Sequence, residues 1–168
     1  MLFAYRFLTS IIHPILILII YLRVFLKKEH GTRYKEKILI NYFNIKRDLK
    51  KKLIWFHVAS IGELQSILPL INKITKTSQN IEILITTVTL SSANLLKRKL
   101  IELQNVNHRF FPLDLNSLSI AFLEKWKPDL VCFVDSEIWP NFLINIKVKS
   151  IFFDKKNWRK KSYDKRPE

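Results

Sequence analysis

The chain has 168 residues, of which 48% are hydrophobic, so it is long enough for one ordinary domain and too short for two comfortable ones. Its single cysteine, Cys132, excludes an internal disulfide framework and a multi-cysteine metal site, and favours a reducing compartment. With 29 Lys and Arg against 14 Asp and Glu, the formal net charge of +15 suits an anionic partner, although an AT-rich genome explains the same Lys-rich, Gly-poor composition.

The first thirty residues contain an uncharged segment, "FLTSIIHPILILIIYL" (7–22), between Arg6 and Arg23. As a helix it measures about 24 Å, less than the roughly 30 Å hydrocarbon core, so spanning the bilayer, lying in its interface and packing as a core helix all stay open. A basic stretch follows instead of a small-residue cleavage site. We therefore predict an uncleaved membrane anchor over 1–30, whose basic flank stays on the cytoplasmic side and binds anionic lipid.

The next segment, 31–52, is a polar, basic connector with a modest apolar patch at "ILINYF". From residue 53 onward, short apolar runs alternate with helical patterns. Strands are expected at 53–60, 81–89, 108–114, 129–137 and 150–154. Helices are expected at 64–74, 91–103 and 116–127, with another after Trp139-Pro140.

This alternation predicts an α/β fold, a Rossmann-like parallel sheet flanked by helices, over 53–154, with a basic tail at 155–168. Ligands of such sheets bind beyond the carboxyl ends of the strands. The polar residues expected at those ends are Ser60, Gly62, Glu63, Thr86, Thr87, Thr89, Asp114, Asp135, Ser136 and Glu137. We expect the three carboxylate positions and the threonine cluster to meet in one crevice.

Each of these residues also has a structural explanation. Glu63 at a helix start interacts favourably with the helix dipole, for about 0.3–1 kcal/mol. Gly62 indicates either a special backbone angle or a close approach to a ligand. His57 lies mid-strand among apolar residues and is expected to be a core histidine, and the threonines are also good β-formers.

The segment "DSEIWPN" (135–141) places two acids in a loop before a helix, which favours function, although a capping carboxylate and a first-turn proline explain the same pattern.

Several motifs are missing from the sequence. It has no GxGxxG or Walker loop, no HExxH or Cys/His metal cluster, and no GxSxG elbow. It also lacks a basic stripe interleaved with aromatics, so no nucleic-acid partner is expected.

Four motifs in order, "WFHVASIGE", "ITTVTLSSA", "HRFFPLD" and "KPDLVCFVDSEIWPN", follow the apolar N-terminal segment. The chain resembles the N-terminal half of the 3-deoxy-D-manno-octulosonic acid (Kdo) transferases, membrane-associated GT-B glycosyltransferases that add Kdo to a lipid A precursor in lipopolysaccharide biosynthesis. The resemblance covers most of the chain. It implies CMP-Kdo as the donor substrate, no cofactor or metal, and a location on the cytoplasmic face of the inner membrane.

The resemblance also implies roles for single residues. Glu63 matches the catalytic base that takes the proton of the acceptor hydroxyl, and Glu137 matches a second acid that binds the acceptor or organises the site. The remaining positions implied to line the acceptor side are Ser60, Gly62, Thr87 and Thr89.

The sequence departs from the family in three places. The connector lacks the glycine usual near the family's Arg/Glu-rich segment, and Asp135 stands where Glu is common. The chain also ends before the second GT-B domain, which makes most donor contacts, so a separate C-terminal half is an expected partner. The alternatives are a truncated, non-catalytic membrane-anchored binding module, and a protein that binds anionic lipid or nucleic acid by charge alone.

Overall fold

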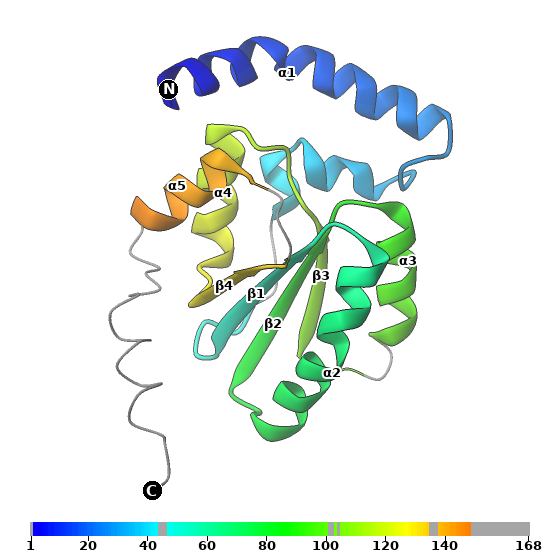
Figure 1. Ribbon diagram of the computed structural model, residues 1–168, viewed down its shortest axis with the longest axis vertical. Helices are drawn as coiled ribbons and strands as arrows, with labels where there is room; N and C mark the ends of the chain where they lie inside the picture. The colour runs from blue at the N-terminus through cyan, green and yellow to red at the C-terminus, as the bar shows by residue number, and fades with distance from the viewer. Residues whose placement is uncertain (1, 44–46, 101–102, 104, 135–137, 149–168) are drawn as a thin grey trace, which may run out of the picture.

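The computed structural model describes residues 2–43, 47–100, 103, 105–134 and 138–148. Within these residues, four parallel strands form one sheet in the order β3-β2-β1-β4 (Figure 1). The strands are β1 (Lys52–Val58), β2 (Ile81–Thr87), β3 (Val106–Phe110) and β4 (Leu130–Phe133). The helices that follow them in turn are α2 (Ile61–Thr77), α3 (Leu90–Lys99), α4 (Asn116–Trp126) and α5 (Pro140–Val148). The predicted α/β fold is confirmed.

The register brings the strand ends to a common edge. Val58 pairs with Thr87, and Thr87 pairs with Phe110, so β1, β2 and β3 end side by side. Phe133 pairs with His57, so β4 ends one step earlier beside β1. We call these strand ends, with the loops that follow them, the carboxyl edge.

Two apolar cores lie on opposite faces of the sheet. On one face Leu53, Trp55 and Leu84 pack against α4 and α5. On the other face alternate residues of the same strands, including Phe56 and Ile85, pack against α2 and α3. Burial on both faces explains why β1 and β2 read as nearly continuous apolar runs.

The third strand lies earlier than predicted, at Val106–Phe110 instead of 108–114. Pro112 has no N–H to donate to a ladder, so the strand stops before it. Phe111 still donates its backbone N–H to the carbonyl of Thr87, at 2.9 Å, and the chain then turns into α4.

The connector forms two short 3₁₀ helices, η1 (Arg33–Lys37) and η2 (Ile40–Phe43). Phe43 is 2% exposed and joins the core beneath α4. The backbone N–H of Leu113 donates to the carbonyl of Lys37 at 2.9 Å. The segment that the sequence left unassigned is therefore part of the domain.

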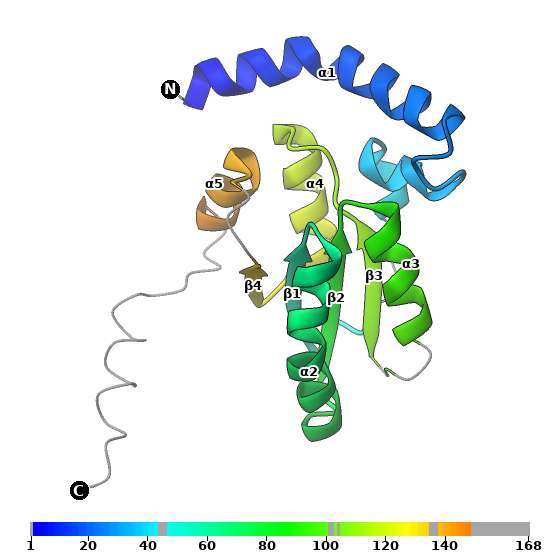
Figure 2. The ribbon, with the colours of Figure 1, turned by 45° about the vertical axis from the view of Figure 1, so that its right-hand side comes forward.

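The N-terminal helix α1 (Leu2–Phe25) contains Pro14 and is long and apolar enough to cross a membrane, by length and composition. Figures 1 and 2 both show it lying across the carboxyl edge, at the end toward which the strands point.

Candidate functional site

The first turn of α2 holds Glu63 through two reciprocal hydrogen bonds. Ser60 caps the helix, and its Oγ accepts from the backbone N–H of Glu63 at 3.2 Å. In return, Glu63 Oε2 accepts from the backbone N–H of Ala59 at 2.8 Å. This arrangement resembles a capping box, in which each side chain satisfies a backbone donor that the helix leaves free. It fixes one carboxylate oxygen at the carboxyl edge.

Gly62 lies exposed beside this carboxylate, and its backbone needs no glycine. Its φ is not positive, and among the described residues beyond its chain neighbours a Cβ built there would meet only Ser60 Oγ, at an ordinary contact distance of 3.9 Å. Of the two explanations given for Gly62, the special backbone angle is therefore wrong. The space into which a Gly62 side chain would extend, next to Glu63, is open among the described residues.

A second helix begins next to the first. Thr89 caps α3, and its Oγ1 accepts from the backbone N–H of Ser92 at 3.2 Å. Thr89 and Ser60 each lie two residues beyond the paired residues Thr87 and Val58 of neighbouring strands. The positive ends of two helix dipoles therefore lie beside each other at this edge, which favours an anionic or electron-rich ligand.

Thr87 is completely buried and does not line a surface in this structure. Its Oγ1 lies 2.9 Å from His108 Nε2. The other ring nitrogen, Nδ1, lies 3.1 Å from Arg33 NH1, which can only donate. His108 therefore accepts at Nδ1 and donates from Nε2 to Thr87. Burial, with help from the charge of Arg33, lowers the pKa of His108 to about 3, which keeps the ring neutral.

His57 is a core residue, as predicted. Its Nδ1 lies 2.9 Å from Thr86 Oγ1, which also accepts from Trp55 Nε1 at 2.9 Å. Burial lowers the pKa of His57 to about 4. Thr86 thus serves two buried aromatic side chains and is itself completely buried.

Asp114 corrects the expectation of three carboxylates in one crevice. It is 7% exposed, and its carboxylate accepts from the backbone N–H groups of Asn141 and Phe142, both at 3.1 Å. The hydroxyl of Tyr5 donates a third hydrogen bond, at 2.8 Å. Asp114 caps α5 from a distant loop and binds α1, so both of its oxygens have structural partners.

Glu137, Asp135 and Ser136 lie outside the described residues, as does the strand expected at 150–154. The residues on either side of the acidic loop both contact His57. The backbone N–H of Val134 donates to the carbonyl of His57 at 3.0 Å, and the ring of Trp139 lies 6.0 Å from the imidazole.

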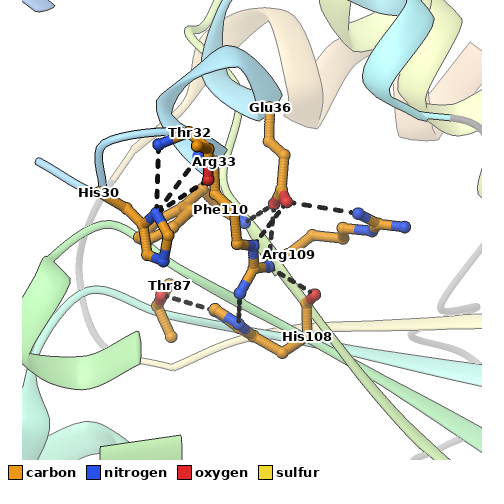
Figure 3. A network of polar contacts seen from close by, with 8 residues as sticks. All are labelled: His30, Thr32, Arg33, Glu36, Thr87, His108, Arg109 and Phe110. Carbon is orange, nitrogen blue, oxygen red and sulfur yellow. Dashed lines mark hydrogen bonds and ion pairs between the residues drawn. The ribbon is translucent and has the colours of Figure 1, made fainter. Parts of the chain in front are cut away.

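A polar network joins the connector to the end of β3 (Figure 3). Glu36, which is 4% exposed, accepts from Arg33 Nε at 2.7 Å, from Arg109 NH1 at 3.3 Å and from the backbone N–H of Phe110 at 2.9 Å. Through Arg33 the network reaches His108, and through His108 it reaches Thr87. The connector therefore braces the carboxyl edge from one side.

A second buried pair braces the loop before α3. Lys37 Nζ lies 2.7 Å from Glu29 Oε2 and donates to the carbonyl of Val88 at 2.9 Å. Burial lowers the pKa of Lys37, and the Glu29 carboxylate opposes that shift. Sequence reasoning missed Glu29, Glu36 and Lys37. Two carboxylates within a strongly basic stretch were the signal that could have revealed them.

The chain is similar to proteins of one family. Residues 32–153 match the sequence model described as 3-deoxy-D-manno-octulosonic-acid transferase (kdotransferase). A 3-deoxy-D-manno-octulosonic acid transferase of Rickettsia bellii is 33% identical, over 94% of this chain and 38% of that protein. The transferase of Rickettsia typhi is 37% identical, over 64% of this chain and 23% of that protein. A probable mitochondrial 3-deoxy-D-manno-octulosonic acid transferase of Arabidopsis thaliana is 32% identical, over 83% of this chain and 30% of that protein. The chain thus aligns with well under half of the length of each.

Proposed function

Because this chain belongs to the Kdo transferase family, we propose that it supplies the acceptor-side half of an enzyme that transfers Kdo from CMP-Kdo to a lipid A precursor. The placement of Glu63 carries this proposal. It is a half-buried carboxylate at the carboxyl edge, with one oxygen held by the backbone and open space beside it.

Glu63 has the geometry of a general base. Its Oε2 is held by the Ala59 N–H, whereas Oε1 has no hydrogen-bond partner among the described residues. In the proposed step, the acceptor hydroxyl attacks the anomeric carbon of Kdo while a Glu63 oxygen takes its proton. The new C–O bond forms as the bond to the CMP phosphate breaks, with inversion. The base needs to lie within about 2.6–3.2 Å of the hydroxyl, or one water away.

The acceptor is proposed to lie over the starts of α2 and α3. Ser60, Gly62 and Thr89 are exposed there. Thr87 supports the site from below the surface, where His108 holds its hydroxyl. Glu137 is proposed as the second acid. The phosphates of a lipid A precursor would be attracted to the two helix starts and to the basic surface of the chain.

The donor site is proposed to lie mostly outside these 168 residues. We propose that CMP-Kdo is bound mostly by a C-terminal half, because the chain spans 38% of the Rickettsia bellii relative. No cofactor or metal is proposed. The proposed location is the cytoplasmic face of the inner membrane, where the apolar helix α1 binds the bilayer.

A transfer assay in detergent tests the proposal without requiring a bilayer. Labelled CMP-Kdo and lipid A precursor are incubated with this chain alone, with a supplied C-terminal half alone, and with both. Transfer only in the mixture, abolished by Glu63→Gln, is the expected result. A mixture that binds both substrates but transfers nothing would instead support a non-catalytic binding module.

A further inference from the structure

The N-terminal end of α1 is fastened to the domain by buried polar groups. Tyr5 donates its hydroxyl to Asp114 at 2.8 Å. Arg6 donates from Nε to Asn141 Oδ1 at 3.3 Å and from NH2 to Asn145 Oδ1 at 3.2 Å. Asp114, Asn141 and Asn145 are each less than 9% exposed, so these contacts satisfy groups that the domain buries.

The other end of α1 is fastened as well. Ile20 is 5% exposed, and the ring of Tyr21 meets that of Tyr34 edge-on, with centroids 5.5 Å apart. Arg23 Nε lies 2.9 Å from Glu29 Oε1, the same carboxylate that pairs with Lys37. Both ends of the helix are therefore anchored to one globular domain.

The opposite side of α1 carries an exposed apolar stripe. Its members recur at spacings of three and four residues, so they lie on one helix face. Each is between 52% and 84% exposed: Phe3, Phe7, Ile11, Ile15, Leu18 and Leu22. A stripe of this length, which none of the described residues covers, indicates a partner with an extended apolar surface.

Contact at both ends is incompatible with a helix that crosses the bilayer. The 24 residues of α1 measure about 36 Å as a helix. If the helix spanned the bilayer, its far end would lie across the roughly 30 Å hydrocarbon core, on the side opposite the domain. In the structure, Tyr5 and Tyr21, near opposite ends, both touch the same domain. A spanning helix could keep only one of these contacts.

We propose that α1 lies in the plane of a single leaflet of anionic phospholipid, with the stripe immersed and the carboxyl edge turned toward the membrane. This rests on the proposed function for the identity of the acceptor. The exposed cations Arg23, Lys27 and Lys28 lie at one end of the helix, where anionic headgroups would meet them. This orientation would bring Glu63 and its neighbours to the headgroup region of the membrane, where the sugars of a glycolipid lie.

The test is a depth profile on the full chain. In a Cys132→Ser background, single cysteines replace Phe7, Ile15 or Leu22 and carry an environment-sensitive fluorophore. Vesicles of phosphatidylethanolamine and phosphatidylglycerol contain lipids with quenchers at shallow or deep acyl positions. A fluorophore at Asn80→Cys, an exposed position at the opposite edge of the sheet, is the matched control.

Equal, shallow quenching at all three helix positions and none at Asn80→Cys is expected, with binding at least about tenfold weaker to vesicles of phosphatidylcholine alone. Deep quenching at Ile15→Cys with shallow quenching at the other two would show a spanning helix and overturn the inference. Failure to bind the anionic vesicles, or quenching at Asn80→Cys, would also overturn it. None of these outcomes bears on the transfer assay in detergent, so the two proposals fail separately.

Discussion

The carboxylate of Glu63 accepts a hydrogen bond of 2.8 Å from the backbone N–H of Ala59, four residues before it. The same side chain is therefore a structural cap and the proposed base. These two roles make different demands, because the cap needs only an acceptor oxygen, whereas the base needs a proton-accepting carboxylate.

Glu63→Gln separates the two roles. The amide oxygen can still accept from Ala59, so the melting temperature should stay close to that of the wild type. Transfer, measured with the C-terminal half supplied, should fall by about 100-fold or more. Glu63→Ala should lose transfer and also about 1 kcal/mol of stability, because the Ala59 N–H loses its acceptor while the Ser60 cap stays. Full activity in Glu63→Gln would mean that the residue is a cap only.

The open space at Gly62 gives a second test. Gly62→Ala adds a methyl group that, in the part of the chain the structure describes, meets only Ser60 Oγ, at 3.9 Å, so folding should be unaffected or slightly improved. If the acceptor occupies that space, KM for the lipid A precursor should rise several-fold. Gly31→Ala is the matched control, because a Cβ there meets no described atom within 4 Å and Gly31 is not part of the proposed acceptor site. Equal kinetics for both variants would place the acceptor elsewhere.

The sheet was predictable because its central strands are buried on both faces, as Leu53 and Ile83 show. Runs of this kind can be recognised without knowing what covers them. The end of β3 was misplaced because the apolar run continues through Phe111 and Leu113, while Pro112 ends the ladder.

The role of Asp114 could not be predicted from its neighbours in sequence. Its partners are Tyr5, 109 residues earlier, and the start of α5, 27 residues later. Local pattern placed Asp114 at the end of a strand that in the structure already ends at Phe110, and only the long-range contacts show that its oxygens are occupied. The same holds for Glu36, whose partners Arg109 and Phe110 lie on another element.

Glu36 should therefore be a stability residue. Glu36→Gln leaves Arg33 and Arg109 without their shared carboxylate, and both arginine side chains are only partly exposed, at 32% and 28%. We expect a loss of about 2–4 kcal/mol in the free energy of unfolding, measured by urea denaturation. Asp48→Asn, at an exposed acid whose carboxylate accepts from the nearby Lys50 N–H and from no other described residue, should cost less than about 0.5 kcal/mol. Equal losses in the two variants would contradict the bracing role.

The buried histidines predict a pH dependence of stability. Burial lowers the pKa of His57 to about 4 and of His108 to about 3, below the unfolded value of 6.5. As the pH falls through 6.5, the two histidines bind protons in the unfolded chain but stay neutral in the folded chain. The folded state therefore loses stability relative to the unfolded state. Each histidine should contribute a slope approaching about 1.4 kcal/mol per pH unit, and neither should contribute above pH 7.

The slope is measured by urea unfolding between about pH 5 and 7, above the range in which ordinary carboxylates titrate. His57→Gln can still bond to Thr86 but carries no titrating ring, so it should remove about half of the slope that the two histidines supply. His108→Gln should remove the other half. Because the readout is the change of stability with pH, it is independent of whatever each substitution costs in packing. A slope that neither variant changes would mean that both rings protonate in the folded state, which the contact of His108 Nδ1 with Arg33 opposes.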